Sequence, residues 1–331
     1  MRKARIKGEG GDCYHCMNRM LDGPFVMGDE EKAFLRETLR SCEGFCGVRV
    51  LTYALMRDHF HVLVEVPPRR GVSDGDLLRR LETLYSKGFA AEIGGRLQSL
   101  EEQNTAASRR EAEEIRARFA GRMGDVSQFM KTMKQRFTQW FNREHRRRGT
   151  LWEQRFKSVL VERGPALAVM AAYIDLNAVR AGVVRDPGDY PFCGYGEARA
   201  GSGRARQGLA VAIAGAGSPA TWSATHRRYR SLLDAGGKGK RPHSDTAREA
   251  VRVAVESGGK LSLAQALHCR VRHFSDGVAL GSRDFVESVF EKNRGFFGSR
   301  RKTGARRIRR LDDAELFTAR DLRRDPLTAP K

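Results

Sequence analysis

The chain lacks the long apolar segments by which membrane and secreted proteins are recognised. No run approaches the roughly 20 apolar residues that a membrane-spanning helix needs. The first five residues, Met1-Arg2-Lys3-Ala4-Arg5, do not begin the apolar stretch of a signal peptide. We therefore expect no membrane partner and a cytoplasmic location.

Acidic residues are few relative to basic ones. The chain has 61 Lys and Arg against 40 Asp and Glu, which gives a formal net charge of +21. Such an excess concerns partners rather than fold, and nucleic acid is the usual partner of so basic a chain. Arginine dominates, and its planar fork suits phosphate oxygens. The alternative is a basic, well-solvated surface without a partner.

Cysteine is scarce, with six residues in 331. Cys13 with Cys16, and Cys42 with Cys46, have spacings that could suggest zinc. However, Cys16 falls within a predicted strand and Cys46 at the entry to the next, which favours small core residues. In the cytoplasm these thiols stay reduced.

Two histidines stand out in the segment from Met56 to Val66. His59 and His61 are two residues apart, so on a strand their side chains share one face. Phe60 and the valines that follow it at every second position fill the other face. Paired imidazoles on a strand are good ligands for a divalent metal, although an isolated pair is often only a surface feature. Glu65 shares their face, either orienting an imidazole or as a strand-end charge.

A tyrosine and an amide lie on one predicted helix about a hundred residues later. Tyr173 and Asn177 are four apart, so they occupy the same face one turn apart. Pro165 suits the first turn of this helix and Gly182 its end. A tyrosine can act as a nucleophile, and an amide oxygen can bind a hard metal ion. Taken alone, the pair is typical of ordinary packing.

Taken together, these segments resemble the HUH endonucleases with one catalytic tyrosine, and within them the REP-associated tyrosine transposases (IS200-like). The resemblance covers about residues 10–200. It rests, in order, on Tyr14-His15-Cys16-Met17-Asn18-Arg19, His59-Phe60-His61, Phe129-Met130-Lys131 through Trp140-Phe141-Asn142, Leu151-Trp152-Glu153-Gln154-Arg155-Phe156-Lys157-Ser158, the Tyr173 helix with Asn177-Ala178-Val179-Arg180-Ala181-Gly182, and Asp189-Tyr190-Pro191-Phe192. Asn177 stands where many relatives have Gln. Ala178 replaces the usual Pro, so we expect the helix to continue further.

The resemblance implies a metal-dependent DNA transposase. His59, His61 and Asn177 would hold one Mg²⁺ or Mn²⁺, and Tyr173 would attack a DNA phosphate, giving a 5′-phosphotyrosine and a free 3′-hydroxyl. The substrate would be single-stranded or hairpin DNA of the REP type, handled by a monomer or a homodimer in the bacterial cytoplasm near the nucleoid. The alternatives are a related HUH enzyme that initiates replication or plasmid transfer, and a hairpin-binding protein that has lost catalysis.

The predicted order of elements favours an α+β fold. Strands at 12–20, 48–56, 59–66 and 155–162, a helix at 29–42 and an amphipathic helix from Val126 to Phe141 form a β-α-β-β-α-β-α pattern. Without a glycine-rich phosphate loop, this pattern fits a ferredoxin-like antiparallel sheet with helices on one face. The other face would then be free for a metal ion and DNA.

Two further regions are assigned on charge and composition. Basic residues on and after the amphipathic helix are candidate DNA contacts: Lys131, Lys134, Arg143, Arg146, Arg147, Arg155 and Lys157. After a transposase domain at 1–200, residues 201–331 are expected to be a helical, basic region. Within it, a linker at 236–240, short helices at 245–256, 262–271 and 285–291, and an arginine-rich arm at 300–310 suggest a helix-turn-helix-like module.

Overall fold

The computed structural model combines helices with one large sheet, which confirms the predicted α+β class. It describes residues 6, 8, 11–21, 27–69, 71–214, 221–234, 252, 256, 260–308, 311, 315–320 and 327–328. The predicted linker at 236–240, most of the predicted helix at 245–256 and the arginines at 309–310 lie outside these residues.

The first elements follow the predicted order closely. They are β1 (Asp12–Arg19), α1 (Asp29–Cys46), β2 (Arg49–Leu55) and β3 (His59–Val66). Acidic side chains in the first turn of α1 stabilise the helix, because the N-terminal end of a helix carries a partial positive charge. The helix stops at Gly47, whose φ of 63° is left-handed and favours glycine. β2 and β3 form the predicted antiparallel hairpin, in which Ala54 lies opposite His61.

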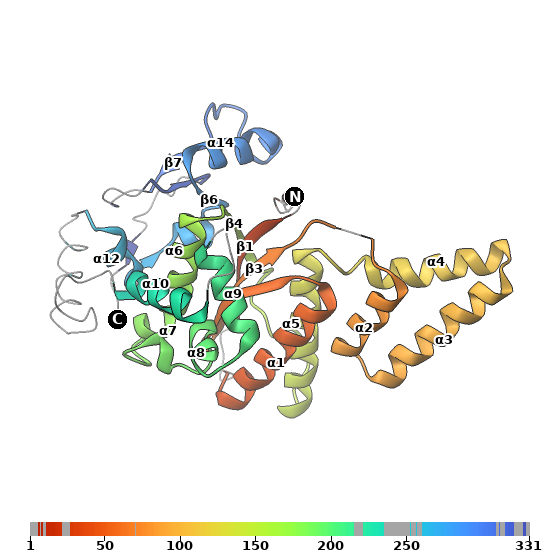
Figure 1. The fold of residues 1–331 in the computed structure, drawn as a ribbon. Coiled ribbons are helices and arrows are strands. Elements are labelled where there is room, and N and C mark those ends of the chain that lie inside the picture. Colours follow the sequence, from red (N-terminus) through yellow and green to blue (C-terminus); the bar gives the residue numbers. More distant parts are fainter. Residues whose placement is uncertain are drawn as a thin grey trace.

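The sheet is larger than predicted because the last part of the chain extends it. Its order is β2-β3-β1-β4-β6-β8-β7, where β4 is Lys157–Val161, β6 is Ala279–Gly281, β7 is Arg306–Arg307 and β8 is Phe317–Thr318. All neighbours in it are antiparallel except β4 and β6, which are parallel. Figure 1 shows β6 beside β4. The region after residue 200 was expected to be mostly helical. Strands of two or three residues are too short for an alternating pattern, so the sequence did not reveal them.

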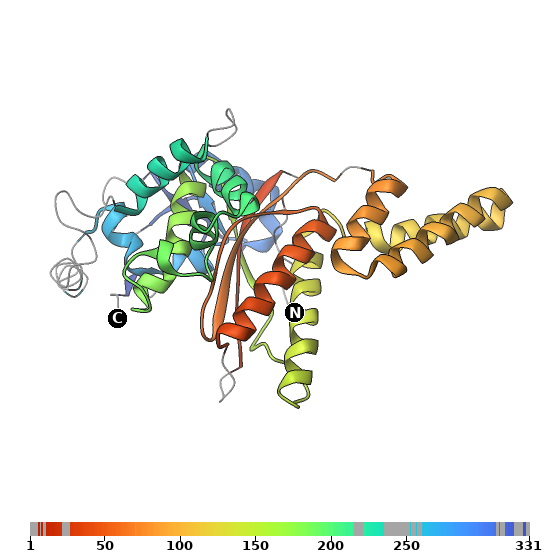
Figure 2. The same cartoon turned by 60° about the horizontal axis from the view of Figure 1, so that its bottom comes forward.

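Helices cover both faces of the sheet, and the expected free face is not found among the described residues. Phe60 and His61 point to opposite faces because they are neighbours in β3. On the Phe60 side, Trp152 packs against Phe60 and against Phe137 of α5 (Val126–Glu144). On the other side, Thr52 of β2 bonds to α6 (Pro165–Asp175). Figures 1 and 2 both show the sheet between α1 with α5 and the later helices.

Three helices form an arm beside the sheet. They are α2 (Asp74–Leu84), α3 (Lys87–Gln103) and α4 (Ala106–Ala120). Ser73 caps α2 by accepting the N–H of Asp76. The charged stretch from Leu100 to Arg118 belongs to α3, α4 and the turn between them. Figures 1 and 2 show both helices projecting away from the sheet.

The remaining helices come later in the chain. They are α7 (Asn177–Arg180), η1 (Pro187–Asp189), α8 (Gly194–Arg199), α9 (Gly203–Ala214), α10 (Trp222–Asp234), α12 (Leu263–Leu267), α13 (His273–Asp276), α14 (Arg283–Lys292) and η2 (Arg294–Phe296). Among them, α7, α9, α10 and α12 contact α6. Strands β5 (Arg270–Val271) and β9 (Leu327–Thr328) form a second, small sheet. Strands β5 and β6 therefore separate the helices of the predicted three-helix module. None of the described helices has both the length and the apolar character needed to cross a membrane.

Candidate active site around Tyr173

The two predicted histidines lie together at the start of β3. Their ring centroids are 5.1 Å apart and the rings are nearly perpendicular. Nδ1 of His59 lies 2.6 Å from a carboxylate oxygen of Asp58. This hydrogen bond, with the charges of His59 and Arg19, lowers the pKa of Asp58 to about 2. Because a carboxylate only accepts, His59 donates through Nδ1. In its neutral form His59 therefore has a lone pair on Nε2.

A third histidine, His15 of β1, belongs to the same cluster. Its Nδ1 lies 2.6 Å from the carbonyl oxygen of Phe274, and its Nε2 lies 2.8 Å from Nδ1 of His61. Burial lowers the pKa of His15 to about 4 and that of His61 well below its usual value, so both rings are neutral. The carbonyl fixes the proton of His15 on Nδ1, so Nε2 accepts from His61. His61 is left with a lone pair on its own Nε2.

His15 was not among the predicted site residues, although it lies in a segment that carried the resemblance. Met17 lies opposite His61 in the β1–β3 ladder, so His15 is diagonal to His61 on the same face. A sequence-based search could have found it through this pairing and its parity in β1. That search needs the register of two strands that are far apart in the chain.

Tyr173 lies on the histidine side of the sheet. The centroid of its ring is 6.5 Å from that of His61, and the rings are perpendicular. The side chain is 2% exposed. Phe274 of α13 contacts the Tyr173 ring edge-on, with centroids 4.8 Å apart. None of the described residues forms a hydrogen bond with the Tyr173 hydroxyl.

Asn177 comes one turn after Tyr173, but the expected uninterrupted helix breaks at Leu176, between α6 and α7. The amide nitrogen of Asn177 donates to the carbonyl oxygen of Ile174 at 2.9 Å and, more weakly, to that of Tyr173 at 3.4 Å. These bonds satisfy carbonyls at the end of α6. They use only the donor end of the amide, so its oxygen is the atom that could accept or bind a cation.

Arg180 is a site residue that the sequence analysis did not single out. Its guanidinium carbon lies 4.0 Å from the centroid of the Tyr173 ring. It donates to the carbonyl oxygen of Tyr173 at 2.7 Å and to that of Leu267 at 2.8 Å. Burial lowers the pKa of Arg180. Among the described residues it pairs with no carboxylate, so a buried positive charge lies directly beside the tyrosine.

The last part of the chain covers this cluster. Besides the contacts of Phe274 and Leu267 described above, Asp276 forms an ion pair with Lys157 at 2.9 Å. The hydroxyl of Thr318 donates to the carbonyl of Gly277 at 2.8 Å. We call residues 267–277 the cap segment. It lies about a hundred residues after Tyr173 in the chain, and no motif in it pointed to the site.

A buried carboxylate anchors the helix that carries Tyr173. Asp175 is fully buried and accepts hydrogen bonds from the hydroxyls of Thr52 and Tyr229 and from the N–H of Tyr195. These partners come from β2, α10 and α8. Burial raises the pKa of Asp175 to about 6, against the opposing effect of its hydrogen bonds. The network fixes the position of α6 against the sheet.

The predicted basic contacts are found in three places in the structure. Three of them, Lys131, Lys134 and Arg155, line a single cavity beside α5. Lys157 forms the ion pair with Asp276 of the cap segment that is described above. The other three are at the end of α5 and in the following turn: Arg143 pairs with Glu144, Arg146 is exposed, and Arg147 donates to the carbonyl of Thr150.

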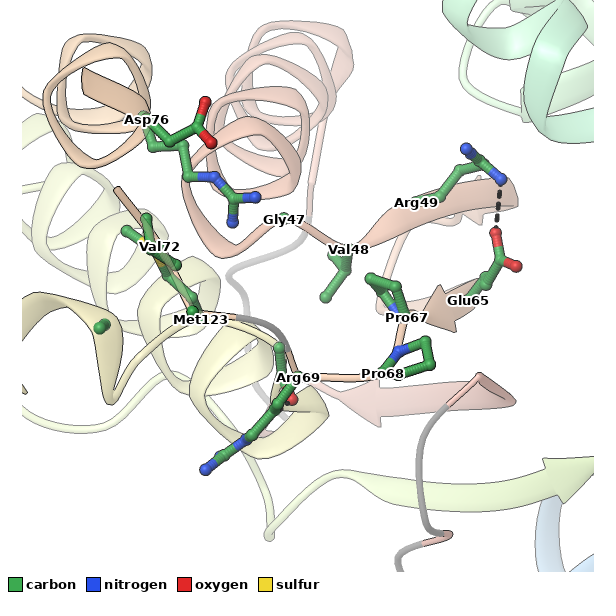
Figure 3. Close-up of a pocket in the computed structure, with 14 residues that line it drawn as sticks. Gly47, Val48, Arg49, Glu65, Pro67, Pro68, Arg69, Val72, Asp76 and Met123 are labelled. Carbon is green, nitrogen blue, oxygen red and sulfur yellow. Dashed lines mark hydrogen bonds and ion pairs between the residues drawn. The ribbon is translucent and has the colours of Figure 1, made fainter. Parts of the chain in front are cut away.

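A second cavity, of about 650 Å³, lies at the other end of β3, between the sheet and the helical arm. In Figure 3 Arg49 and Glu65 point toward each other across its rim, with their charged groups 2.7 Å apart. Glu65 also pairs with Arg163. Glu65 therefore forms ion pairs at the end of β3. Asp58 is the carboxylate that orients a histidine, His59.

Two atoms of the cluster, Nε2 of His59 and Nε2 of His61, are of the kind that can bind a divalent metal, although no group of three or more His, Cys, Asp or Glu side chains in the described residues is arranged to hold one. His59 and His61 each present a lone pair on Nε2, and Asn177 has an amide oxygen left over. Hydrogen bonds to the second nitrogen of each imidazole are typical of histidines that bind metals. The six cysteines are free and buried, as expected of core residues.

Comparison with known proteins gives little. No family model matches the chain, and no curated protein matches it. One solved structure, of a REP-associated tyrosine transposase bound to a REP hairpin, is similar to this chain, with 14% sequence identity and a TM-score of 0.39. The aligned part covers 68% of this chain and 96% of the other chain. A likeness at this level establishes neither the fold nor the function of this chain.

Proposed function

We propose that this chain is a transposase-like enzyme that cuts and rejoins single-stranded or hairpin DNA through Tyr173. The observation that carries the proposal is the 6.5 Å separation between the rings of Tyr173 and His61 on one side of the sheet. A nucleophile beside paired imidazoles is the arrangement that metal-assisted phosphoryl transfer requires. The antiparallel order of β2, β3, β1 and β4 supports the ferredoxin-like arrangement that the resemblance implies.

Tyr173 is the nucleophile in this reaction. Its hydroxyl oxygen bonds to phosphorus and loses its proton, while the bond from phosphorus to the 3′-oxygen breaks and that oxygen gains a proton. One phosphodiester replaces another, so no nucleotide triphosphate is consumed. The positive charge of Arg180, 4.0 Å from the ring, stabilises the negative charge that develops on the phenol oxygen.

Nε2 of His59, Nε2 of His61 and the amide oxygen of Asn177 would hold Mg²⁺ or Mn²⁺. The bound ion would polarise a phosphate oxygen and offset transition-state charge. Asp58 and His15 act on the imidazoles rather than on DNA: they keep the proton on each Nδ1, so that each Nε2 is free to bind.

The described arrangement is closed. Tyr173 is 2% exposed and Phe274 is completely buried over it, so DNA reaches the tyrosine only after the cap segment moves. Tyr173 and the histidines lie together within one chain, which supports action within one subunit, whether the protein is a monomer or a homodimer. The expected setting is the bacterial cytoplasm and its nucleoid.

The test uses a 5′- or 3′-labelled hairpin oligonucleotide with single-stranded flanks, incubated with the protein and Mg²⁺ or Mn²⁺. A covalent adduct on a denaturing gel supports the proposal if it disappears in Tyr173→Phe and if replacing His59 and His61 by Ala abolishes cleavage without abolishing binding. No adduct with any flank or metal contradicts it.

The burial of Tyr173 also favours a second candidate, a hairpin-binding protein that does not cut. In that case the protein binds the hairpin without metal, and Tyr173→Phe binds it as tightly as the wild type. The same gel and a binding measurement therefore separate the two functions.

A further inference from the structure

A cavity of about 520 Å³ beside α5 is lined by both basic and aromatic side chains. Its lining comes from α5 and from the segment that leads into β4, and consists of Ser127, Lys131, Lys134, Gln135, Thr138, Gln139, Thr150, Trp152, Arg155 and Phe156. Three of these residues are cations and none is a carboxylate. Two large aromatic side chains, Trp152 and Phe156, supply its apolar part.

Two of the three cations at this cavity, Lys131 and Arg155, are available to a ligand. Among the described residues, neither Lys131 nor Arg155 pairs with a carboxylate, and both are exposed. Lys134 lies 5.3 Å from the centroid of the Trp152 ring. The indole N–H of Trp152 donates to the hydroxyl of Thr138 at 2.9 Å, which fixes the ring in place. A fixed indole ring near the exposed cations Lys131 and Arg155 suits a flat, apolar group attached to an anion.

We propose that this cavity binds an unstacked base of single-stranded DNA. The base would contact the aromatic side chains Trp152 and Phe156, and the flanking phosphates would pair with Lys131 and Arg155. The amides of Gln135 and Gln139 at the rim can donate to and accept from a base edge. A duplex cannot use the cavity, because its bases are paired and stacked inside the helix. This inference deepens the proposed function, on which its choice of single-stranded DNA rests.

The cavity lies at the same end of the sheet as the histidines. Trp152 forms a bridge with Met20, just after β1, and Arg19 of β1 lies opposite His59 in β3. Trp152 also contacts Phe60, the residue between the two histidines, edge-on at 5.3 Å. The cavity is therefore on the opposite face from the imidazoles. A strand with one phosphate at His59 and His61 would pass around the end of β1 to place a neighbouring base here.

The decisive measurement compares two strands with identical charge. Fluorescence anisotropy would give the affinity of the full chain for a labelled 20-nucleotide thymidine strand and for an abasic strand of equal length, both without metal. We expect the thymidine strand to bind about tenfold more tightly. Phe156→Leu keeps an apolar side chain but removes the aromatic ring, and should reduce this difference to about twofold or less, with an unchanged circular dichroism spectrum.

Charge variants test the phosphate contacts separately. Lys131→Gln and Arg155→Gln should weaken the binding of both strands alike. Each should reduce the magnitude of the slope of log affinity against log salt concentration by about 0.7. The matched control Arg148→Gln removes one exposed charge outside the cavity and should change the slope by less. If Arg148→Gln lowers the slope as much as the two cavity variants do, the phosphate contacts are not at this cavity, and that part of the proposal fails.

Two results would overturn the base site. One is equal affinity of the wild type for thymidine and abasic strands; the other is a preference for thymidine that survives in Phe156→Leu. Both experiments are repeated in Tyr173→Phe, which cannot form an adduct. Failure of the proposed reaction therefore leaves the binding comparison intact, and failure of the base site leaves the adduct assay intact.

Discussion

Nε2 of His15 lies 2.8 Å from Nδ1 of His61, which joins the first strand of the sheet to the strand with the paired histidines. The carbonyl of Phe274 holds the other nitrogen of His15, so three segments far apart in the sequence determine which nitrogen of His61 is free. A hydrogen-bonded imidazole is thereby prepared to bind through Nε2 before any ligand arrives.

Replacing His15 tests this relationship directly. His15→Leu removes the acceptor for Nδ1 of His61, and we expect Mn²⁺ affinity to fall about 10- to 100-fold in isothermal titration calorimetry. His15→Gln offers both an acceptor and a donor, and should restore a large part of it. Equal Mn²⁺ affinities for the wild type and His15→Leu would show that the hydrogen bond to His15 does not prepare His61 to bind the ion.

Arg180 should matter for the reaction more than for the fold. Arg180→Gln removes the buried charge beside Tyr173, and adduct formation with the hairpin should slow on the order of 10²-fold. Arg180→Lys keeps the charge and should lose less. If thermal unfolding shows that both variants are equally destabilised and equally slow, the role of Arg180 is structural.

The cap segment should limit how fast Tyr173 reacts. Thr318→Val leaves the carbonyl of Gly277 without its hydrogen bond, and Asp276→Asn removes the ion pair with Lys157. Each loss destabilises the closed arrangement by about 1 kcal/mol, so adduct formation should become about fivefold faster. Arg199→Gln, which removes an exposed pairing elsewhere, is the control. Unchanged or slower rates in both cap variants would contradict this role.

What the sequence could predict was set by local pattern. Strands β2 and β3, the start of α1 and the apolar stripe of α5 each depend on neighbouring residues, and each was predicted. The cap segment and strand β6 depend on contacts with residues more than a hundred positions away. Strand β6 is three residues long, so it carries no periodic signal of its own.

The residues of the candidate site also divide into those that a local pattern predicted and those that depend on distant contacts. His59 and His61 share a face because they are two residues apart, and that parity was visible in the sequence. Arg180 belongs to a segment that carried the resemblance, but the sequence indicated no role for it. Its position over the Tyr173 ring depends on the end of α6 and on the carbonyl of Leu267, which no local pattern describes.

Asp175 should give the protein a pH-dependent stability that Asp175→Asn lacks. Burial raises its folded-state pKa to about 6, above the ordinary value of 3.8, so between these values the folded chain binds more protons than the unfolded chain. Its contribution to stability therefore falls as pH rises from about 4 to about 6, by up to about 3 kcal/mol. Urea unfolding from pH 3.5 to 7 should give the difference in free energy of unfolding between the wild type and Asp175→Asn. This difference should shift in favour of the Asn variant between about pH 4 and about pH 6 and stay constant outside that range, because all other titrations are common to both proteins. A difference that does not change with pH would mean that the pKa of Asp175 is the same in the folded and unfolded chains, because the hydrogen bonds from Thr52, Tyr195 and Tyr229 fully offset its burial.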